Sequence, residues 1–328
     1  MPGSRISQRA QTVLTLALVG TVALSAMGVS APRIATPGNT YSLRYTSVPT
    51  GTGAMAAAME AQRASWTGTV VFAAGRGRLD IVEGGQPPMF TKGDYILFDS
   101  SDFIVVHPAT RTFLLGLSPP PAGGSMQVDI RSTAKNMVVT LDSLGAGETV
   151  DGSPTQRYRL RTSYSLTIDL SRVAPEFKNV EPATTENTLT TEYWYADDGT
   201  VALNPFLRTP NGREPIQERI RELGARAGAA EFMDELSDKM SVATARLPLR
   251  KALVRMTTST HVTNAAGTGG TDTVFEISGR ATTDVDLARL VLPDGYATAS
   301  SAAADSAKSS ATASEDAGAK WRQKPASP

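Results

Sequence analysis

The stretch QRYRLRTSYSLTIDL, from Gln156 to Leu170, alternates two kinds of side chain. From Tyr158 onward every second residue is large and mostly apolar, and Arg, Ser, Thr and Asp residues fill the gaps. Because successive side chains of an extended strand point to opposite faces of a sheet, this pattern predicts one long strand with an apolar and a polar face. The strand would extend roughly 50 Å and needs a broad sheet beside it. Since the other face is polar throughout, we expect an antiparallel sheet that is covered on one side only.

Shorter segments with the same two-residue period lie on both sides of this stretch. Turn-forming sequences such as Asp151-Gly152 separate them, which favours an antiparallel meander. Gly267 to Gly270 is interpreted as one such turn, and Pro175 to Thr185 as an irregular connection. The other predicted strands are 41–48, 66–73, 75–83, 95–98, 103–106, 112–115, 126–131, 137–141, 189–195, 252–263 and 273–278.

Two segments change to a helical pattern. Ala54 to Ala64 is rich in Ala and lacks Pro and Gly, so it predicts a short helix at an end of the sheet. From Ile216 to Met240 the apolar residues are spaced by threes and fours, which predicts a long amphipathic helix. The fold class is therefore mainly β (α+β): a curved antiparallel sheet whose concave side is covered by these two helices.

The ends of the chain differ from its middle. Arg5 and Arg9 precede a short apolar run from Val13 to Ala26, the layout of a secretory signal peptide over residues 1–31; an uncleaved anchor is the alternative. Residues 32–296 form a single predicted domain, and the Ala/Ser-rich residues 297–328 are expected to be disordered. The mature protein is therefore expected to be exported, periplasmic or extracellular, soluble and not membrane-spanning.

Composition excludes several classes of function. The chain of 328 residues has no cysteine, which excludes disulfides, thiolate metal sites, a cysteine nucleophile and a lipid-modified cysteine anchor. Basic and acidic residues are equal in number, and removal of the signal peptide takes away Arg5 and Arg9 but no acidic residue. A slightly acidic mature protein without a basic cluster does not favour a nucleic-acid partner.

No catalytic signature is present. The sequence has no G-x-S-x-G elbow, phosphate-binding loop or H-E-x-x-H motif, and Gly75 to Arg78 is interpreted as a turn. The two histidines, His107 and His261, are interpreted as structural or solvated. Three carboxylate pairs offer oxygen ligands of the kind that calcium takes but are more typical of turns: Asp99 with Asp102, Asp197 with Asp198, and Glu148 with Asp151. We therefore predict no enzyme activity, no cofactor and no metal site.

The polar face of the long strand carries Arg157, Arg159 and Arg161 at every second position. This row is either a solvated outer face or a surface for an anion or a protein partner. The sequence does not distinguish between these two interpretations.

The apolar face has two interpretations as well. It is first of all a core, but a strongly curved sheet cannot be filled by one helix, and an elongated apolar cavity would remain. Such a cavity would bind an acyl chain, with tyrosine hydroxyls near its polar end. The predicted lining is Tyr158, Leu160, Tyr164, Leu166, Ile168, Tyr193 and Tyr195, with Ile220, Leu223 and Ala227 as the lid.

Four segments carry a family resemblance: KGDYILFDSSDFIVVHPATRTFLLG, DGSPTQRYRL, LPLRKALVRMTT and DVDLARLVLPDGY, beginning at Lys92, Asp151, Leu247 and Asp284. With the predicted export signal and meander, the chain resembles the LolA-like group of bacterial outer-membrane lipoprotein carriers, and most closely a family of secreted bacterial proteins of unknown function. The resemblance implies a half-barrel with helices over its open side and a role in handling hydrophobic ligands or lipoproteins without chemistry. It provides no motif from which individual site residues transfer.

Three functions are therefore expected in order. The first is a non-catalytic extracytoplasmic protein that binds or carries a lipid or an acylated protein partner. The second is an envelope interaction or sensor protein of the same fold with a filled core. The third is a hydrolase whose site the sequence does not reveal.

Overall fold

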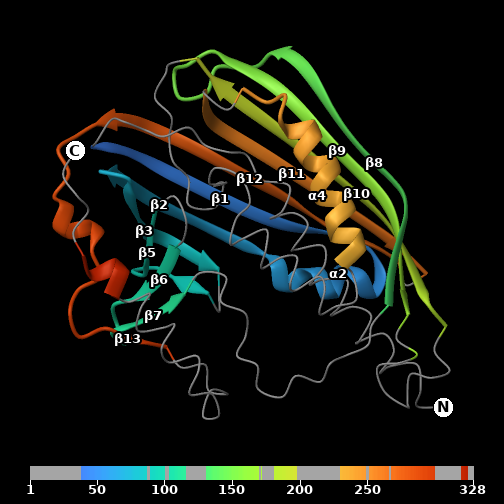
Figure 1. Cartoon of the computed structure of the whole chain (residues 1–328), viewed down its shortest axis with the longest axis horizontal. Coiled ribbons are helices and arrows are strands. Elements are labelled where there is room, and N and C mark those ends of the chain that lie inside the picture. Colours follow the sequence, from blue (N-terminus) through green and yellow to red (C-terminus); the bar gives the residue numbers. More distant parts are fainter. Residues whose placement is uncertain are drawn as a thin grey trace.

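One large curved sheet that does not close on itself dominates the molecule, and the fold is mainly β (Figure 1). The computed structural model describes residues 38–86, 89–99, 103–115, 131–169, 171, 181–197, 230–248, 251–265, 267–299 and 319–323. The predicted signal peptide, most of the predicted strand 126–131 and the predicted lid residues Ile220, Leu223 and Ala227 lie outside these residues.

The elements follow the predicted order closely. The strands are β1 (Asn39–Gly51), β2 (Ala64–Ala73), β3 (Arg76–Gln86), β4 (Phe90–Thr91), β5 (Tyr95–Phe98), β6 (Phe103–His107), β7 (Thr112–Leu115), β8 (Arg131–Ala146), β9 (Thr155–Asp169), β10 (Ala183–Ala196), β11 (Ala252–Asn264), β12 (Gly267–Thr282) and β13 (Ala297–Thr298). The helices are α2 (Gly53–Met59), η1 (Glu60–Gln62), α4 (Ala230–Thr244) and η3 (Leu287–Leu290).

Two antiparallel meanders join in the middle of the sheet. The strand order is β13-β7-β6-β5-β3-β2-β1-β12-β11-β10-β9-β8, with β4 beside β3. The chain therefore builds β1 to β7 toward one edge, resumes with β8 at the opposite edge, and returns until β12 pairs with β1. The strand from which the fold was predicted, β9, lies next to the edge strand β8 and not at the centre of the sheet.

The concave face of the sheet carries the main core. Tyr164 and Leu166 of β9 belong to the same buried cluster as Phe275 of β12 and Phe98 of β5, so the cluster spans the sheet. Helix α4 adds one buried side, with Phe232, Met233, Leu236 and Met240, while Glu231, Asp234 and Glu235 are exposed. Both α2 and α4 lie inside the curve of the sheet (Figure 1). Of the predicted helix from Ile216 to Met240, the described part begins at Ala230 and continues to Thr244.

The strands β5 and β6 are buried on both faces, as their apolar sequences indicate, although the sheet as a whole was expected to be covered on one side only. In β7 Phe113 is buried and its neighbours are half-buried. A second cluster covers their outer face and joins Tyr95, Leu97, Ile104, Val106 and Phe113 to Leu292 and Trp321. Of the tail predicted to be disordered, Ala297–Thr298 pairs with β7 and residues 319–323 place the fully buried Trp321 on this cluster. Residues 319–323 thus have a defined position, because the indole ring of Trp321 is buried against the apolar second cluster.

Three predicted connections are wrong. Gly75 to Arg78 was interpreted as a turn, but β3 already begins at Arg76. Gly267 to Gly270 lies inside β12, and the chain reverses between Asn264 and Gly267, which face each other across the hairpin. Gly270 is needed for close approach, because a Cβ atom there would lie 1.9 Å from the carbonyl oxygen of Thr260. The irregular connection predicted from Pro175 to Thr185 ends earlier, because β10 begins at Ala183.

Candidate functional site

The structure brings the predicted lining residues of β9 and β10 together on the concave face. Leu160, Tyr164, Leu166 and Ile168 of β9 and Tyr193 and Tyr195 of β10 are buried, and Tyr158 is half-buried against the same cluster. The register places Tyr158 opposite Tyr193 and Leu166 opposite Thr185. The two-residue period predicted this arrangement correctly for both strands.

A row of five aromatic residues and one methionine, here called the aromatic row, crosses the concave face, which the sequence did not reveal. From β9 to β2, paired positions hold Tyr158, Tyr193, Met256, Phe275, Tyr45 and Trp66. The rings of Tyr45 and Trp66 stack with centroids 5.3 Å apart, and Tyr45 meets Phe275 edge-on at 6.5 Å. The row is therefore a continuous apolar band at right angles to the strands.

A group of hydroxyl side chains lies beside this aromatic row. We call it the hydroxyl belt and define it as Ser47, Thr162, Thr191, Thr258, Thr260, Thr271 and Thr273. Thr191 faces Thr258 with hydroxyl oxygens 3.3 Å apart, and Thr260 faces Thr271 at 2.9 Å. All are buried except Thr273, which is half-buried. The alternating threonines at 258 and 260 and at 271 and 273 were the signal in the sequence, but only the register shows that they adjoin.

Two tyrosine hydroxyls of the aromatic row reach into the hydroxyl belt. Tyr45 hydrogen-bonds to Ser47 and Thr273, and Tyr193 hydrogen-bonds to Thr191. Burial raises the pKa of both tyrosines above the ordinary value of 10.0, and burial likewise raises the pKa of Tyr164. These phenols are therefore neutral donors and acceptors throughout the physiological pH range.

Tyr195 has a different environment. Its side chain is 2% exposed, and its hydroxyl has no hydrogen-bond partner among the described residues. Burial raises the pKa of Tyr195 well above 10.0, and the neighbouring Tyr193 and Tyr158 raise it further. A buried phenol without a partner is costly, so this position favours an additional polar group nearby.

Helix α4 covers the part of the concave face nearest to β8 and β9. The rings of Phe232 and Tyr164 have centroids 4.9 Å apart, and the Thr162 hydroxyl lies 3.5 Å from the Met240 sulfur. Lys239 donates a 2.8 Å hydrogen bond to the Met137 carbonyl and so ties the helix to the edge strand. The described attachment of α4 therefore combines aromatic packing with polar contacts to β8 and β9.

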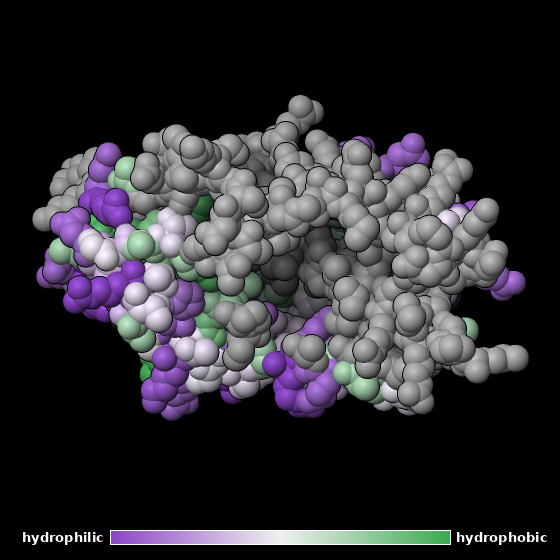
Figure 2. Space-filling model, turned by 90° about the horizontal axis from the view of Figure 1, so that it is seen from below, coloured by the Kyte–Doolittle hydropathy of each residue, from purple (hydrophilic) through white to green (hydrophobic). Residues whose placement is uncertain are grey.

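A small depression opens on the concave side where β9, β10 and β11 meet. Its lining includes Tyr164, Asn187, Leu189, Thr260 and Val262, with Thr188 and His261 at its margin. Figure 2 shows hydrophobic residues at the surface among hydrophilic ones on the face seen from below. The lining of the depression itself contains both apolar and hydroxyl side chains.

The outer face of the sheet carries ion pairs. Glu192 of β10 bridges Arg157 and Arg159 of β9, with nitrogen-oxygen distances of 2.5 and 2.7 Å. Although partial burial of Glu192 opposes its ionisation, the hydrogen bonds from both arginines lower the pKa of its carboxyl group. Two members of the predicted arginine row are therefore bound to the neighbouring strand, and Arg161 is exposed.

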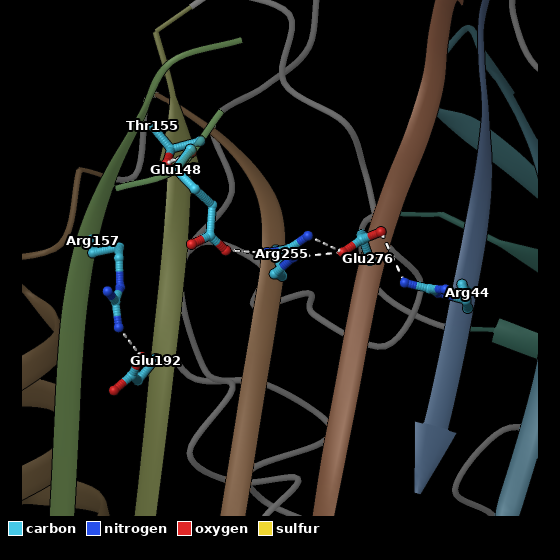
Figure 3. A network of polar contacts seen from close by, with 7 residues as sticks. All are labelled: Arg44, Glu148, Thr155, Arg157, Glu192, Arg255 and Glu276. Carbon is cyan, nitrogen blue, oxygen red and sulfur yellow. Dashed lines mark hydrogen bonds and ion pairs between the residues drawn. The ribbon is translucent and has the colours of Figure 1, made fainter. Parts of the chain in front are cut away.

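A second chain of charges continues across the outer face. Figure 3 shows Arg255 of β11 between Glu148 and Glu276, with Arg44 of β1 on the far side of Glu276. Arg44 and Glu276 are 3.0 Å apart. The chain links three strands and the residues before β9, which supports a structural role for the outer charges.

The weak candidates for chemistry have ordinary partners. His107 lies 3.0 Å from Asp94, whose carboxylate also accepts a hydrogen bond from the Thr91 amide, and His261 is exposed on the outer face. Within the described residues no group of three or more potential metal ligands occurs. Of the carboxylates considered as calcium ligands by sequence, four have basic partners: Asp99 pairs with Lys320, Asp197 with Lys251, Asp151 with Arg280 and Glu148 with Arg255.

Comparison with known proteins adds no assignment. No protein-family model matches the chain, and no curated protein matches its sequence. In the described part of the chain, no helix is both long and apolar enough to cross a membrane.

Proposed function

We propose that the protein is a non-catalytic extracytoplasmic carrier that holds a lipid, or the acyl chains of an acylated protein, against the concave face of its sheet. In this proposal the sheet acts as a half-barrel, and α4 is the end of a longer amphipathic helix that includes Ile220, Leu223 and Ala227. Residues 1–31 direct export and are removed.

The width of the apolar face carries the proposal. Six neighbouring strands from β8 to β1 span roughly 24 Å, because strands lie about 4.8 Å apart. A helix is about 10 Å across, and the described contacts of α4 with the sheet are made to β8 and β9. The aromatic row and Tyr195 extend beyond that width, and in this proposal an acyl chain lies against their buried side chains.

The charged residues of these strands are separated from the proposed ligand-binding face. On β1 and on β9 to β12, every charged side chain belongs to the outer set of positions and the concave positions are uncharged. An apolar ligand would therefore meet no buried charge on these strands.

The experiment is native mass spectrometry, with organic extraction, of the mature protein purified gently from a host that exports it. Discrete added masses that match acyl-containing species are expected. A clean mass without ligand that also takes up no added lipid would overturn the proposal and favour an envelope interaction protein with a filled core. Turnover of general esterase, glycosidase or phosphatase substrates would instead favour a hydrolase.

A matched pair of variants locates the ligand. Leu166→Arg puts a charge on the concave face, where Leu166 is 2% exposed, and is expected to abolish lipid retention. Ser165→Arg puts the same charge on the outer face one residue away and is expected to retain lipid. If Leu166→Arg folds normally by circular dichroism and carries as much lipid as the parent, the proposed lining is wrong.

A further inference from the structure

The hydroxyl belt is an uncharged polar site within an otherwise apolar face. Threonine and valine have nearly the same shape, but a buried hydroxyl needs a hydrogen-bond partner that a methyl group does not. Packing alone therefore does not account for seven hydroxyl residues on adjoining positions of five strands.

The belt has capacity for further hydrogen bonds. Each hydroxyl can donate once and accept twice, so Thr191 and Thr258 keep unused positions after bonding to each other. The Thr260 hydroxyl is more fully used, because it also accepts a 2.8 Å hydrogen bond from the Thr271 amide. The phenols of Tyr45 and Tyr193 join the belt from the aromatic row. A ligand that lies along the aromatic row thus has neutral donors and acceptors directly beside it.

The distribution of charge decides which ligand suits the belt. The nearest charged residues on the belt strands, such as Glu192, Arg255 and Glu276, lie on the outer face and are paired there. On α4, Lys239 is occupied by Glu235 at 2.9 Å and by the Met137 carbonyl. A phosphate group at the belt would be buried without a described cation on these strands, whereas ester carbonyls and hydroxyls need none.

We propose that the hydroxyl belt binds the ester and hydroxyl oxygens of an uncharged glycerolipid, and that the protein therefore selects such lipids over phospholipids with the same acyl chains. This inference rests on the proposed function and specifies its ligand. The acyl chains lie along the aromatic row and beneath α4, and the glycerol end lies at Thr191, Thr258 and Thr260.

A competition experiment tests the inference. The mature protein is loaded from detergent micelles that contain equimolar dioleoylglycerol and dioleoylphosphatidylglycerol, and the bound lipid is extracted and quantified. The expected result is a preference for dioleoylglycerol of at least about tenfold. Equal loading, or a preference for the phospholipid, would overturn the inference but leave the proposed function standing. Failure to load either lipid would contradict the proposed function itself.

Isosteric variants assign the preference to the belt. Thr191→Val with Thr260→Val removes two belt hydroxyls while it keeps their shape, and is expected to lower the preference to less than about threefold. Thr190→Val, on the outer face of the same strand, is the control and is expected to keep the parent preference. Circular dichroism and thermal unfolding establish that each variant is folded. An unchanged preference in a folded double variant would show that the belt does not bind the glycerol end.

Discussion

The guanidinium group of Arg76 lies over the indole ring of Trp321, with its central carbon 5.4 Å from the ring centroid. The same group donates a 2.9 Å hydrogen bond to the carbonyl oxygen of Lys320 and another to that of Gln323. The Trp321 carbonyl in turn accepts a 2.7 Å hydrogen bond from the Leu292 amide. Residues 320–323 are thus bound to β3 and to the segment after β12.

Removing the indole is expected to destabilise the protein. Trp321→Ala should lower the free energy of unfolding by about 3 kcal/mol, because a fully buried aromatic side chain is lost from the outer cluster over β5 to β7. Urea denaturation measures the change, and Gln323→Ala, which alters an exposed side chain, is the control. Equal unfolding midpoints for Trp321→Ala and the parent would show that the tail contributes nothing to stability.

The buried phenols predict an unusual alkaline titration. Burial is the main cause of the raised pKa of Tyr45, Tyr95, Tyr164, Tyr193 and Tyr195, with Tyr95 raised to about 12. Because the folded state favours the neutral phenol, the contribution of these phenols to the free energy of unfolding is fully present below the ordinary pKa of 10.0. It is lost as the pH rises above that value.

Near-ultraviolet absorbance provides the measurement. At pH 10.0 the folded protein, which has eight tyrosines, should show clearly less than half of the tyrosinate signal that full ionisation gives, and the rest should appear on alkaline unfolding. Tyr164→Phe should remove tyrosinate absorbance only from the part of the signal that appears on alkaline unfolding. Identical titrations of the folded chain and of the chain in denaturant would contradict the burial of these phenols.

The pair of arginines around Glu192 predicts an acid dependence of stability. The lowered pKa of Glu192 means that its stabilising contribution is complete above the ordinary value of 4.5 and is lost as the pH falls through the lowered value. Glu192→Gln should therefore lower the free energy of unfolding by about 1 to 2 kcal/mol at neutral pH, with a smaller difference from the parent below about pH 4.5.

Urea unfolding over a pH series checks this dependence. Glu186→Gln, on the same strand but exposed, should change the free energy of unfolding by less than about 0.5 kcal/mol. A difference between Glu192→Gln and the parent that stays constant down to acidic pH would exclude the ionised carboxylate as its source.

The local pattern of the sequence predicted the strands and their faces well. Alternation in β9, β10 and β11 is a property of neighbouring residues, so it can be seen without knowing which strands pair. The concave placement of Tyr164, Leu166 and Tyr193 follows from that alternation alone.

The features that depend on pairing could not be predicted in this way. The hydroxyl belt exists because register places Thr191 beside Thr258 and Thr260 beside Thr271, residues that are 67 and 11 positions apart. Trp321 was missed because a lone aromatic residue in a stretch rich in Ala and Ser has no periodic neighbours. The two-sided burial of β5 and β6 was visible in their apolar sequences, but the segment that covers their outer face was not.

The pairing of β1 with β12 sets the order in which the sheet can be completed. Arg44 and Glu276, which face each other across this pair, are 232 residues apart in the chain. Contacts between such distant residues form slowly, because a long loop must close before they stabilise anything. Until the last long strand has emerged during synthesis or transport, β1 and β11 each keep an unpaired edge. A chain that is cut short before Gly267 would therefore expose two open edges, the arrangement that invites strand-to-strand aggregation.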